Sequence, residues 1–155
     1  MCGIVGYVNF DGSEVPLELI KKATDELEHR GPDGEGQWAF GNVGLGHRRL
    51  SIIDLSELGS QPMLSLDGNF VISYNGEIYN YLEIKKELEA EGYKFISNTD
   101  TEVVLNALIC WGTDAILKFN GMFAFSFFDK KRERMIIARD RFGVKPLYYS
   151  FQGNR

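Results

Sequence analysis

Helical periodicity in the hydrophobic positions marks the first and the central parts of this chain. Leu17, Ile20 and Leu27 lie on one face of a helix that we expect over residues 16–29. Further helices are expected over residues 80–91, over residues 99–111 and, as a short segment, up to residue 119. A glycine follows each of the two longer central helices directly, as is common at helix ends.

Short runs rich in aromatic and β-branched residues predict strands on both sides of the central helices. The expected strands span residues 3–10, 37–40, 43–46, 49–53, 69–74, 122–129, 134–140 and 147–151. The strands over residues 122–129 and 134–140 form a hairpin, with Phe123, Phe125 and Phe127 on one face. Because strands are followed by helices and then by strands again, the order favours an α+β layered sandwich over a doubly wound fold.

Composition narrows the function classes without identifying one. With 155 residues, 44% hydrophobic and 25% charged, the chain is long enough for a single domain with its own core. A net charge of −5 without a basic cluster argues against a nucleic-acid surface. The longest apolar run, residues 122–128, is too short to cross a membrane. Two cysteines and no secretory leader predict a protein of the reducing cytoplasm.

The second residue, Cys2, is the first candidate for chemistry. If Met1 is removed, Cys2 carries a thiol and a free α-amine on the same residue. A thiol needs a base to become a nucleophile, and an N-terminal amine can serve as that base. The alternative is that Cys2 is a small buried hydrophobe at the start of a strand.

Seven segments carry a resemblance to a known family. In chain order they read CGIVGYV, HRGPDGEG, GHRRLSIIDLS, YNGEIYNY, NTDTEVVL, NGMFAFSFFD and RDRFGVKPLYY. Together they resemble the glutaminase domain of asparagine synthetases, a branch of the class II (N-terminal nucleophile) glutamine amidotransferases. The resemblance implies a four-layer αββα sandwich of the N-terminal nucleophile hydrolase type over residues 1–155. It also implies that this domain is incomplete at its C-terminus and that the synthetase domain is absent.

The resemblance assigns the reaction to three residues. Cys2, as the mature N-terminus, would attack the side-chain amide carbon of glutamine. The Asn75 side chain and the Gly76 backbone N–H would stabilise the oxyanion of the tetrahedral intermediate. Asn-Gly at the end of a strand suits this role, because glycine permits close approach and asparagine supplies a donor. An ordinary turn at Asn75-Gly76 is the alternative.

The same resemblance assigns the binding of glutamine to four residues. Arg49 would bind the α-carboxylate and Asp100 the α-ammonium, with Glu77 lining the pocket and Arg30 supporting it from nearby. Because side chains alternate along a strand, only one of Arg48 and Arg49 should face the pocket. Without the resemblance, Arg49 would be an ordinary surface arginine of a strand. Asp100 would then be an acidic residue in the first turn of a helix with a capping-box sequence.

The implied activity is hydrolysis of glutamine to glutamate and ammonia through a Cys2 thioester. The ammonia would pass to a synthetase domain or subunit. Association of two copies of the chain as a homodimer is a further alternative. No cofactor is expected in this chain, since ATP and Mg²⁺ would belong to the absent synthetase domain. No metal site is expected either, because His29 and His47 lack ligand spacing with the cysteines. The alternatives are a non-catalytic glutamine-binding or docking module and an inert fragment of a longer synthetase.

Overall fold

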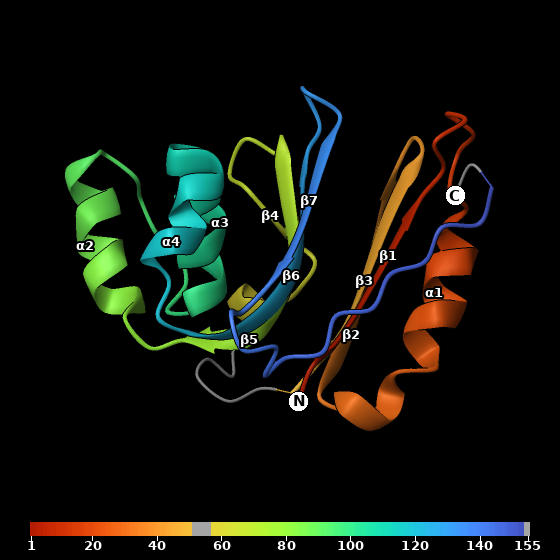
Figure 1. The fold of residues 1–155 in the computed structure, drawn as a ribbon, viewed down its shortest axis with the longest axis horizontal. Coiled ribbons are helices and arrows are strands. Elements are labelled where there is room, and N and C mark those ends of the chain that lie inside the picture. The colour runs from red at the N-terminus through yellow and green to blue at the C-terminus, as the bar shows by residue number, and fades with distance from the viewer. Residues whose placement is uncertain (51–56, 154–155) are drawn as a thin grey trace.

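Two antiparallel sheets lie face to face, and helices cover the outer side of each (Figure 1). The structure is a computed structural model that describes residues 1–50 and 57–153. Within that part of the chain, the first sheet has the order β1 (Gly3–Val8), β3 (Val43–Arg49) and β2 (Gly34–Phe40). Its outer face is covered by α1 (Leu17–Asp25), which the short helix η1 (Glu28–Arg30) follows.

The second sheet has four strands among the described residues, against three in the first. Among the described residues its order is β4 (Met63–Leu64), β5 (Phe70–Ile78), β6 (Gly121–Asp129) and β7 (Arg134–Arg139). Its outer face carries α2 (Tyr81–Ala90), α3 (Asp100–Trp111) and α4 (Ala115–Lys118), with the short helices η2 (Glu57–Gly59) and η3 (Gly112–Asp114) in the connections. The four layers therefore run α1, first sheet, second sheet and α2–α4, which confirms the expected αββα sandwich.

The alternation of β6 divides the core into two layers. Phe123, Phe125 and Phe127 face α3 and its neighbours, as the sequence predicts. Phe128, on the opposite side of the strand, packs between the sheets with Val43 and Leu45 of β3. One aromatic-rich strand thus supplies side chains to both apolar layers, and burial of such side chains is the main source of stability.

Two hydrogen bonds join the sheets directly beneath the site described below. The Ser73 hydroxyl donates to the Gly46 carbonyl at 3.0 Å, and the His47 Nε2–H donates to the Tyr74 carbonyl at 3.0 Å. His47 is 1% exposed, and burial lowers its pKa to about 4, so the ring is neutral. These bonds fix β3 relative to β5 where both strands contribute to one cavity.

The start of α3 follows its sequence signal only in part. The Thr99 hydroxyl caps the helix by accepting from the Glu102 N–H at 3.2 Å. The Glu102 carboxylate does not return to Thr99, because it accepts from the Ser97 N–H at 2.7 Å and from the Ile96 N–H at 2.9 Å. Glu102 thereby orders the loop ahead of the helix and presents Asp100, the first helical residue, toward the second sheet.

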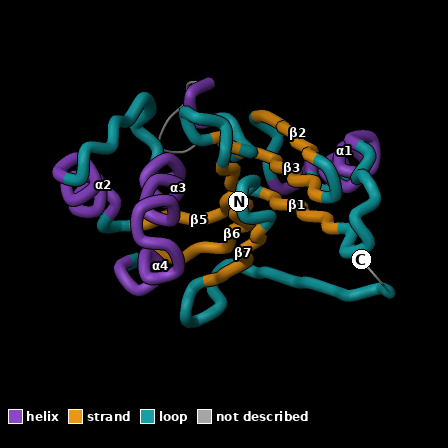
Figure 2. Tube along the Cα trace, turned by 90° about the horizontal axis from the view of Figure 1, so that it is seen from above, coloured by secondary structure: helices purple, strands orange, loops and turns teal. Residues whose placement is uncertain are grey.

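Several expected boundaries differ from the structure. The first helix ends at Asp25 rather than at residue 29, and β3 continues to Arg49, so no new strand begins there. The remainder of the strand expected over residues 49–53 lies largely outside the described residues. The strand expected over residues 147–151 is wrong, because this stretch runs as a loop without strand pairing among the described residues (Figure 2).

The strand expected over residues 69–74 is longer than its sequence suggests. β5 does not end at Asn75-Gly76 but passes through both residues to Ile78. Asn75 pairs with Ala124 and Gly76 with Phe123 in the antiparallel register with β6. The turn alternative for Asn75-Gly76 is therefore wrong, because continuous pairing with β6 holds this dipeptide extended.

Candidate functional site

The N-terminus lies between the two sheets (Figure 2). Residues around it line a cavity of about 120 Å³. Its walls come from the ends of β3 and β5, the start of α3, the chain ahead of β4 and the chain beyond β7. Six of the seven residues that the sequence marks for a site line it: Cys2, Arg49, Asn75, Gly76, Glu77 and Asp100. The seventh, Arg30, lies behind the cavity.

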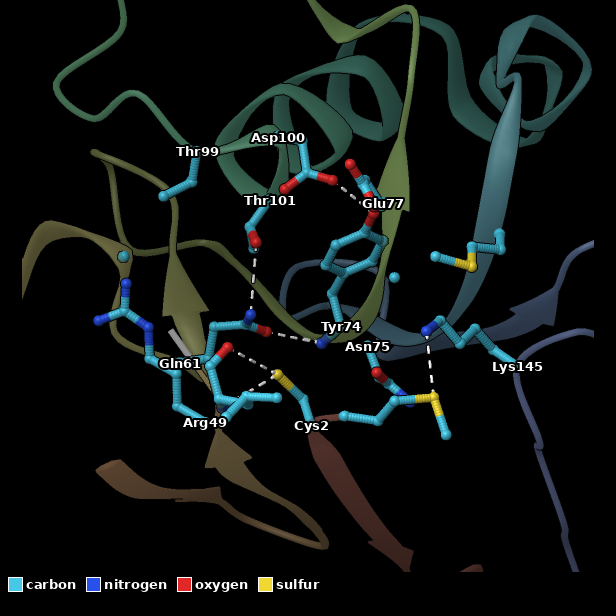
Figure 3. Close-up of a pocket in the computed structure, with 15 residues that line it drawn as sticks. Cys2, Arg49, Gln61, Tyr74, Asn75, Glu77, Thr99, Asp100, Thr101 and Lys145 are labelled. Carbon is cyan, nitrogen blue, oxygen red and sulfur yellow. Dashed lines mark hydrogen bonds between the residues drawn. The ribbon is translucent and has the colours of Figure 1, made fainter. Parts of the chain in front are cut away.

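Cys2 is held against the end of β3. Its Sγ accepts a hydrogen bond from the Leu50 N–H at 3.3 Å and donates to the Leu50 carbonyl at 3.6 Å. The Arg30 Nε–H donates to the Cys2 carbonyl at 3.3 Å, from the short helix that follows α1. Arg30 therefore supports the backbone of Cys2 and does not line the cavity. The thiol side chain reaches the cavity from the first sheet (Figure 3).

Asn75 and Gly76 face Cys2 from the second sheet. Asn75 is buried in the middle of β5 and lines the cavity. A Cβ atom at position 76 would lie 2.5 Å from the Met122 carbonyl oxygen and 2.8 Å from Phe123. Any residue with a side chain would therefore push β5 away from β6, which explains why glycine is required here. The dipeptide is thus fixed by strand pairing opposite the thiol.

Adjacent arginines of β3 point to opposite sides of the sheet, as the alternation rule predicts. Arg48 turns outward and contacts the Asp25 carboxylate at 2.6 Å and the Glu35 carboxylate at 2.9 Å. Arg49 turns inward and lines the cavity. Its guanidinium lies directly over Gly59, where a side chain would collide with it. The expectation that only one of the two arginines faces the pocket is confirmed.

Asp100 is 5% exposed and is held by two donors on one oxygen. The Tyr74 hydroxyl donates to its Oδ2 at 2.7 Å and the Ile78 N–H donates to the same atom at 2.9 Å. Burial raises the pKa of Asp100 above the usual aspartate range, although these two hydrogen bonds oppose the change. Burial also raises the pKa of Tyr74 well above its ordinary value, and the Asp100 carboxylate adds to the effect. Tyr74 is therefore a fixed donor.

The sequence reasoning missed several polar residues of the cavity wall, among them Tyr74, Gln61, Thr101 and Lys145. Tyr74 supports Asp100, and Gln61 joins the Tyr74 N–H at 2.7 Å to the Thr101 hydroxyl at 3.3 Å. Lys145 closes the side of the cavity opposite Arg49 (Figure 3). Tyr74 and Lys145 stand inside the quoted segments YNGEIYNY and RDRFGVKPLYY, so a signal was present there. Gln61 and Thr101 are ordinary polar residues whose role depends on the folded arrangement.

The described residues give no support for a metal site or a membrane-spanning helix. There, no three histidine, cysteine, aspartate or glutamate side chains are close enough to hold a metal ion together. No helix of the described chain has the length and apolar character needed to traverse a bilayer. Cys110 is partly buried and packs on the main core, away from the cavity. The chemistry of the described structure therefore centres on the thiol, amide, guanidinium and carboxylate of one cavity.

Comparison with known proteins matches the whole chain. A family model described as "Glutamine amidotransferase domain" covers residues 1–155. Asparagine synthetase (glutamine-hydrolyzing) 3 of Bacillus subtilis is 42% identical over 157 residues, covering 99% of this chain and 25% of that protein. Asparagine synthetase (glutamine-hydrolyzing) 1 of the same organism is 46% identical over 157 residues, covering 97% of this chain and 24% of that protein. The chain therefore spans about a quarter of the length of these two relatives.

A solved structure supports the same fold. Glutamine phosphoribosylpyrophosphate amidotransferase from Bacillus subtilis, complexed with ADP and GMP, superimposes with a TM-score of 0.79 at 22% sequence identity. The match covers 99% of this chain and 40% of that chain. At this identity the likeness establishes the fold and carries no residue roles.

Proposed function

Because this chain belongs to the glutamine amidotransferase domain family, we propose that it hydrolyses glutamine to glutamate and ammonia with Cys2 as the nucleophile. The observation that carries the proposal is the meeting of Cys2, Asn75, Gly76, Arg49 and Asp100 on the walls of one cavity. They come from four separate places in the sequence and supply a nucleophile, oxyanion donors and two opposite charges. Glutamine needs all of these, since it is a zwitterion with an amide to be cleaved.

Substrate binding uses the two charges. The Arg49 guanidinium binds the α-carboxylate of glutamine through paired N–H donors. Asp100 accepts the α-ammonium, and Tyr74 and Ile78 leave its Oδ1 for that contact by donating to Oδ2. The side-chain amide of glutamine then extends across the cavity toward Cys2. This arrangement fixes the reacting carbon near the thiol.

Removal of Met1 must come first, because it gives Cys2 the free α-amine that the reaction uses. The amine takes the thiol proton as Sγ attacks the amide carbon, and negative charge develops on the carbonyl oxygen. The Asn75 amide and the Gly76 N–H donate to that oxygen. As the carbon–nitrogen bond breaks, the amine passes its proton to the leaving nitrogen, which departs as ammonia. A γ-glutamyl thioester on Cys2 remains.

Water completes the cycle. The α-amine takes a proton from water as its oxygen attacks the thioester carbon, and the same two donors stabilise the second oxyanion. Collapse of this intermediate breaks the carbon–sulfur bond, and the sulfur recovers the proton. Glutamate leaves and the thiol is restored. The sum is glutamine plus water giving glutamate plus ammonia, with no change of oxidation state.

The use of the ammonia is a further part of the proposal. Two relatives carry the name asparagine synthetase (glutamine-hydrolyzing), and each is about four times as long as the matched segment. We place the consumption of ammonia, and any need for ATP and Mg²⁺, in a synthetase domain or subunit of that kind. In this scheme residues 1–155 are the N-terminal glutaminase portion, which works in the cytoplasm. A homodimer is compatible with it.

A second candidate follows from the position of Met1. With Met1 in place its side chain lines the cavity and its Sδ lies 3.3 Å from the Lys145 ammonium. A chain that keeps this residue has no α-amine on Cys2 and less room beside it. Such a protein would be a non-catalytic glutamine-binding or docking module. The state of Met1 therefore separates the two functions.

Intact mass and glutamate release together test the proposal. We expect purified protein to lack Met1 and to release glutamate from glutamine. Cys2→Ala should reduce that release by roughly 10⁴-fold or more, since the whole covalent route is lost. Cys110→Ala is the matched control, because Cys110 packs on the core away from the cavity, and it should keep the activity. Retention of Met1, or equal activity in the Cys2 variant, would overturn the proposed enzyme.

A further inference from the structure

Lys145 is a buried ammonium with no assigned role. Its side chain is 6% exposed, and its Nζ donates to the Met1 Sδ at 3.3 Å. Among the described residues it forms no ion pair with a carboxylate. A buried ammonium loses its hydration, so it requires acceptors or a function that justifies the cost. A thioether sulfur is a weak acceptor and offsets little of that cost.

The backbone around Lys145 holds the ammonium in place. The Asp140 carboxylate accepts from the Lys145 N–H at 3.0 Å, from the Val144 N–H at 2.9 Å and from the Phe123 N–H at 3.2 Å. This carboxylate ties the segment after β7 to β6. Lys145 therefore reaches the cavity from a fixed turn and not from a loose tail. Four hydrogen-bonded donors on one carboxylate, with Phe142 as the fourth at 3.1 Å, make the position reproducible.

Met1 marks the distance between Lys145 and the start of the chain. Its Sδ lies five bonds from the nitrogen of the Met1–Cys2 peptide bond, so the 3.3 Å contact places the Lys145 Nζ within about 10 Å of that nitrogen. Removal of Met1 converts the nitrogen of that bond into the α-amine of Cys2. The same event removes the Sδ that the ammonium contacts. Lys145 and the residue that carries the new amine both lie on the wall of the cavity.

The other charges of the cavity lie elsewhere around Cys2. Arg30 donates to the Cys2 carbonyl from behind, and Arg49 lies on the opposite side of Cys2 from Lys145 (Figure 3). Asp100 and Glu77 line the cavity from α3 and β5, and Asp100 is held by Tyr74 and Ile78. In the proposed function Arg49 and Asp100 are neutralised by the bound zwitterion. Arg30 and Lys145 then remain as cations near Cys2, and of these two Lys145 is the one that lines the cavity.

We infer that Lys145 is a positioning residue that keeps the α-amine of mature Cys2 in its neutral, proton-accepting form. A positive charge nearby disfavours a second positive charge on the amine. A neutral amine is the form that can take the thiol proton, so the charge of Lys145 makes the base available at lower pH. This inference rests on the proposed function, because it requires an N-terminal Cys2 that uses its amine as the base.

The pH profile of the reaction tests this role. In Lys145→Met the acid limb of kcat/KM for glutamine should move to higher pH by about one unit, as expected for loss of one nearby charge. At a pH below both limbs the variant should therefore be about tenfold slower than the wild type. On the alkaline plateau the two proteins should agree within about twofold, because the amine is neutral in both. Lys145→Arg keeps the charge and should keep the acid limb near that of the wild type.

A second readout separates this effect from a folding defect. The rate of Cys2 labelling by 6-diazo-5-oxo-norleucine, measured against pH and read by peptide mapping, should show the same displaced limb in Lys145→Met. Methionine has a similar length and a flexible stem, so it can fill the space of the lysine. Lys131→Met removes a lysine from the exposed turn between β6 and β7 and serves as the charge-matched control. Its profile should match that of the wild type.

Each result decides the question. An acid limb that stays in place in Lys145→Met, with Cys2 labelled and Met1 absent, would overturn the role of Lys145 and leave the proposed glutaminase standing. Equal loss of rate at every pH would also overturn it, since that is the signature of a structural defect. A chain that retains Met1 would overturn both proposals together. Displacement in Lys145→Met and in no control supports the inference.

Discussion

The two sides of the cavity are built in different ways. On the side of Asp100 the polar groups are cross-linked before any ligand arrives, because Tyr74, Ile78 and Gln61 connect β5, α3 and the chain ahead of β4. On the side of Cys2 the thiol's hydrogen bonds within the described chain go to the backbone of Leu50, and Met1 also lines the cavity there. The first side is preorganised for recognition, and the second depends on a processing step.

Because the two sides differ in this way, we expect substitutions on the Asp100 side and on the Cys2 side to change different kinetic constants. Changes on the recognition side should weaken glutamine binding and leave the chemical step nearly intact. Changes on the nucleophile side should slow the chemical step and leave binding nearly intact. Interactions present equally in ground and transition states alter KM, whereas those gained in the transition state alter kcat. Substitutions on each side therefore test whether binding and chemistry are separated in this way.

The largest of these effects is expected at Asn75. Asn75→Ala removes a donor to the substrate's carbonyl oxygen, which becomes negatively charged only after Cys2 attacks. The value of kcat should therefore fall by roughly 10²–10³-fold with KM little changed. Steady-state release of glutamate measures both constants. Asn69→Ala, at an exposed turn before β5, is a matched control and should leave both constants unchanged. A large rise in KM with normal kcat would move Asn75 to the recognition side.

The next effect concerns the stability of the whole fold, because His47 of the first sheet is hydrogen-bonded to the second sheet. Its pKa of about 4 in the folded protein lies below the ordinary value of 6.5, so the unfolded chain binds the proton first. Stability from this group is fully present above pH 6.5 and is lost as the pH falls through 4. The loss amounts to about 3 kcal/mol of the free energy of unfolding.

Denaturant unfolding at several pH values checks this contribution. His47→Gln can still donate to the Tyr74 carbonyl but cannot titrate, so its stability should fall less steeply between pH 6.5 and pH 4. The difference between the two proteins isolates the histidine from the carboxylates that titrate in the same range. Parallel curves for wild type and variant would show that His47 does not bridge the sheets as a neutral ring.

On the recognition side, Asp100→Asn should raise KM for glutamine by about 10- to 100-fold, since a buried charge partner of the ammonium is lost. The turnover number should change little. In the wild type, KM should also rise as the pH falls, because protonation removes the same charge. The raised pKa of Asp100 places this rise at a higher pH than for an ordinary aspartate. The asparagine variant should lack that pH dependence, and a loss confined to kcat would contradict the assignment.

Tyr74→Phe is expected to have the smallest effect. It removes the 2.7 Å hydrogen bond to Asp100 but leaves the donor from the Ile78 N–H. KM should rise by about 5- to 10-fold, in the same direction as in Asp100→Asn. In a double variant the tyrosine change should add almost nothing, since its partner charge is already absent. Full additivity would mean that Tyr74 acts on glutamine independently of Asp100.

The sequence predicted local structure better than the connections around the site. Period and alternation alone predict the hairpin of β6 and β7 and the opposite directions of Arg48 and Arg49. The capping-box pattern and the glycine at residue 112 predict the ends of α3. No such pattern predicts the path of β5 through Asn75-Gly76, because only pairing with β6 shows that this dipeptide stays extended. The strand expected over residues 147–151 failed for the same reason, since pattern cannot supply a pairing partner.

The site itself was predictable in its chemical groups and not in its supports. The thiol of Cys2 suggests its role by itself, the family resemblance assigns roles to Arg49 and Asp100, and the structure brings all three to one cavity. Gln61 contacts Tyr74 and Thr101, which are distant from it in sequence. Such contacts depend on tertiary packing, so spacing along the chain gives no indication of them, whereas Lys145 already stands inside one of the quoted segments.

Labelling of Cys2 by a reactive glutamine analogue shows whether the chain has a processed nucleophile and a formed glutamine pocket. The protein is incubated with 6-diazo-5-oxo-norleucine, with and without excess glutamine, and its intact mass and N-terminal peptide are measured. We predict a chain without Met1, carrying one label on Cys2 that glutamine prevents, with Cys110 unlabelled. An unlabelled chain that still begins with Met1 would contradict the account and leave a binding module in place of an enzyme.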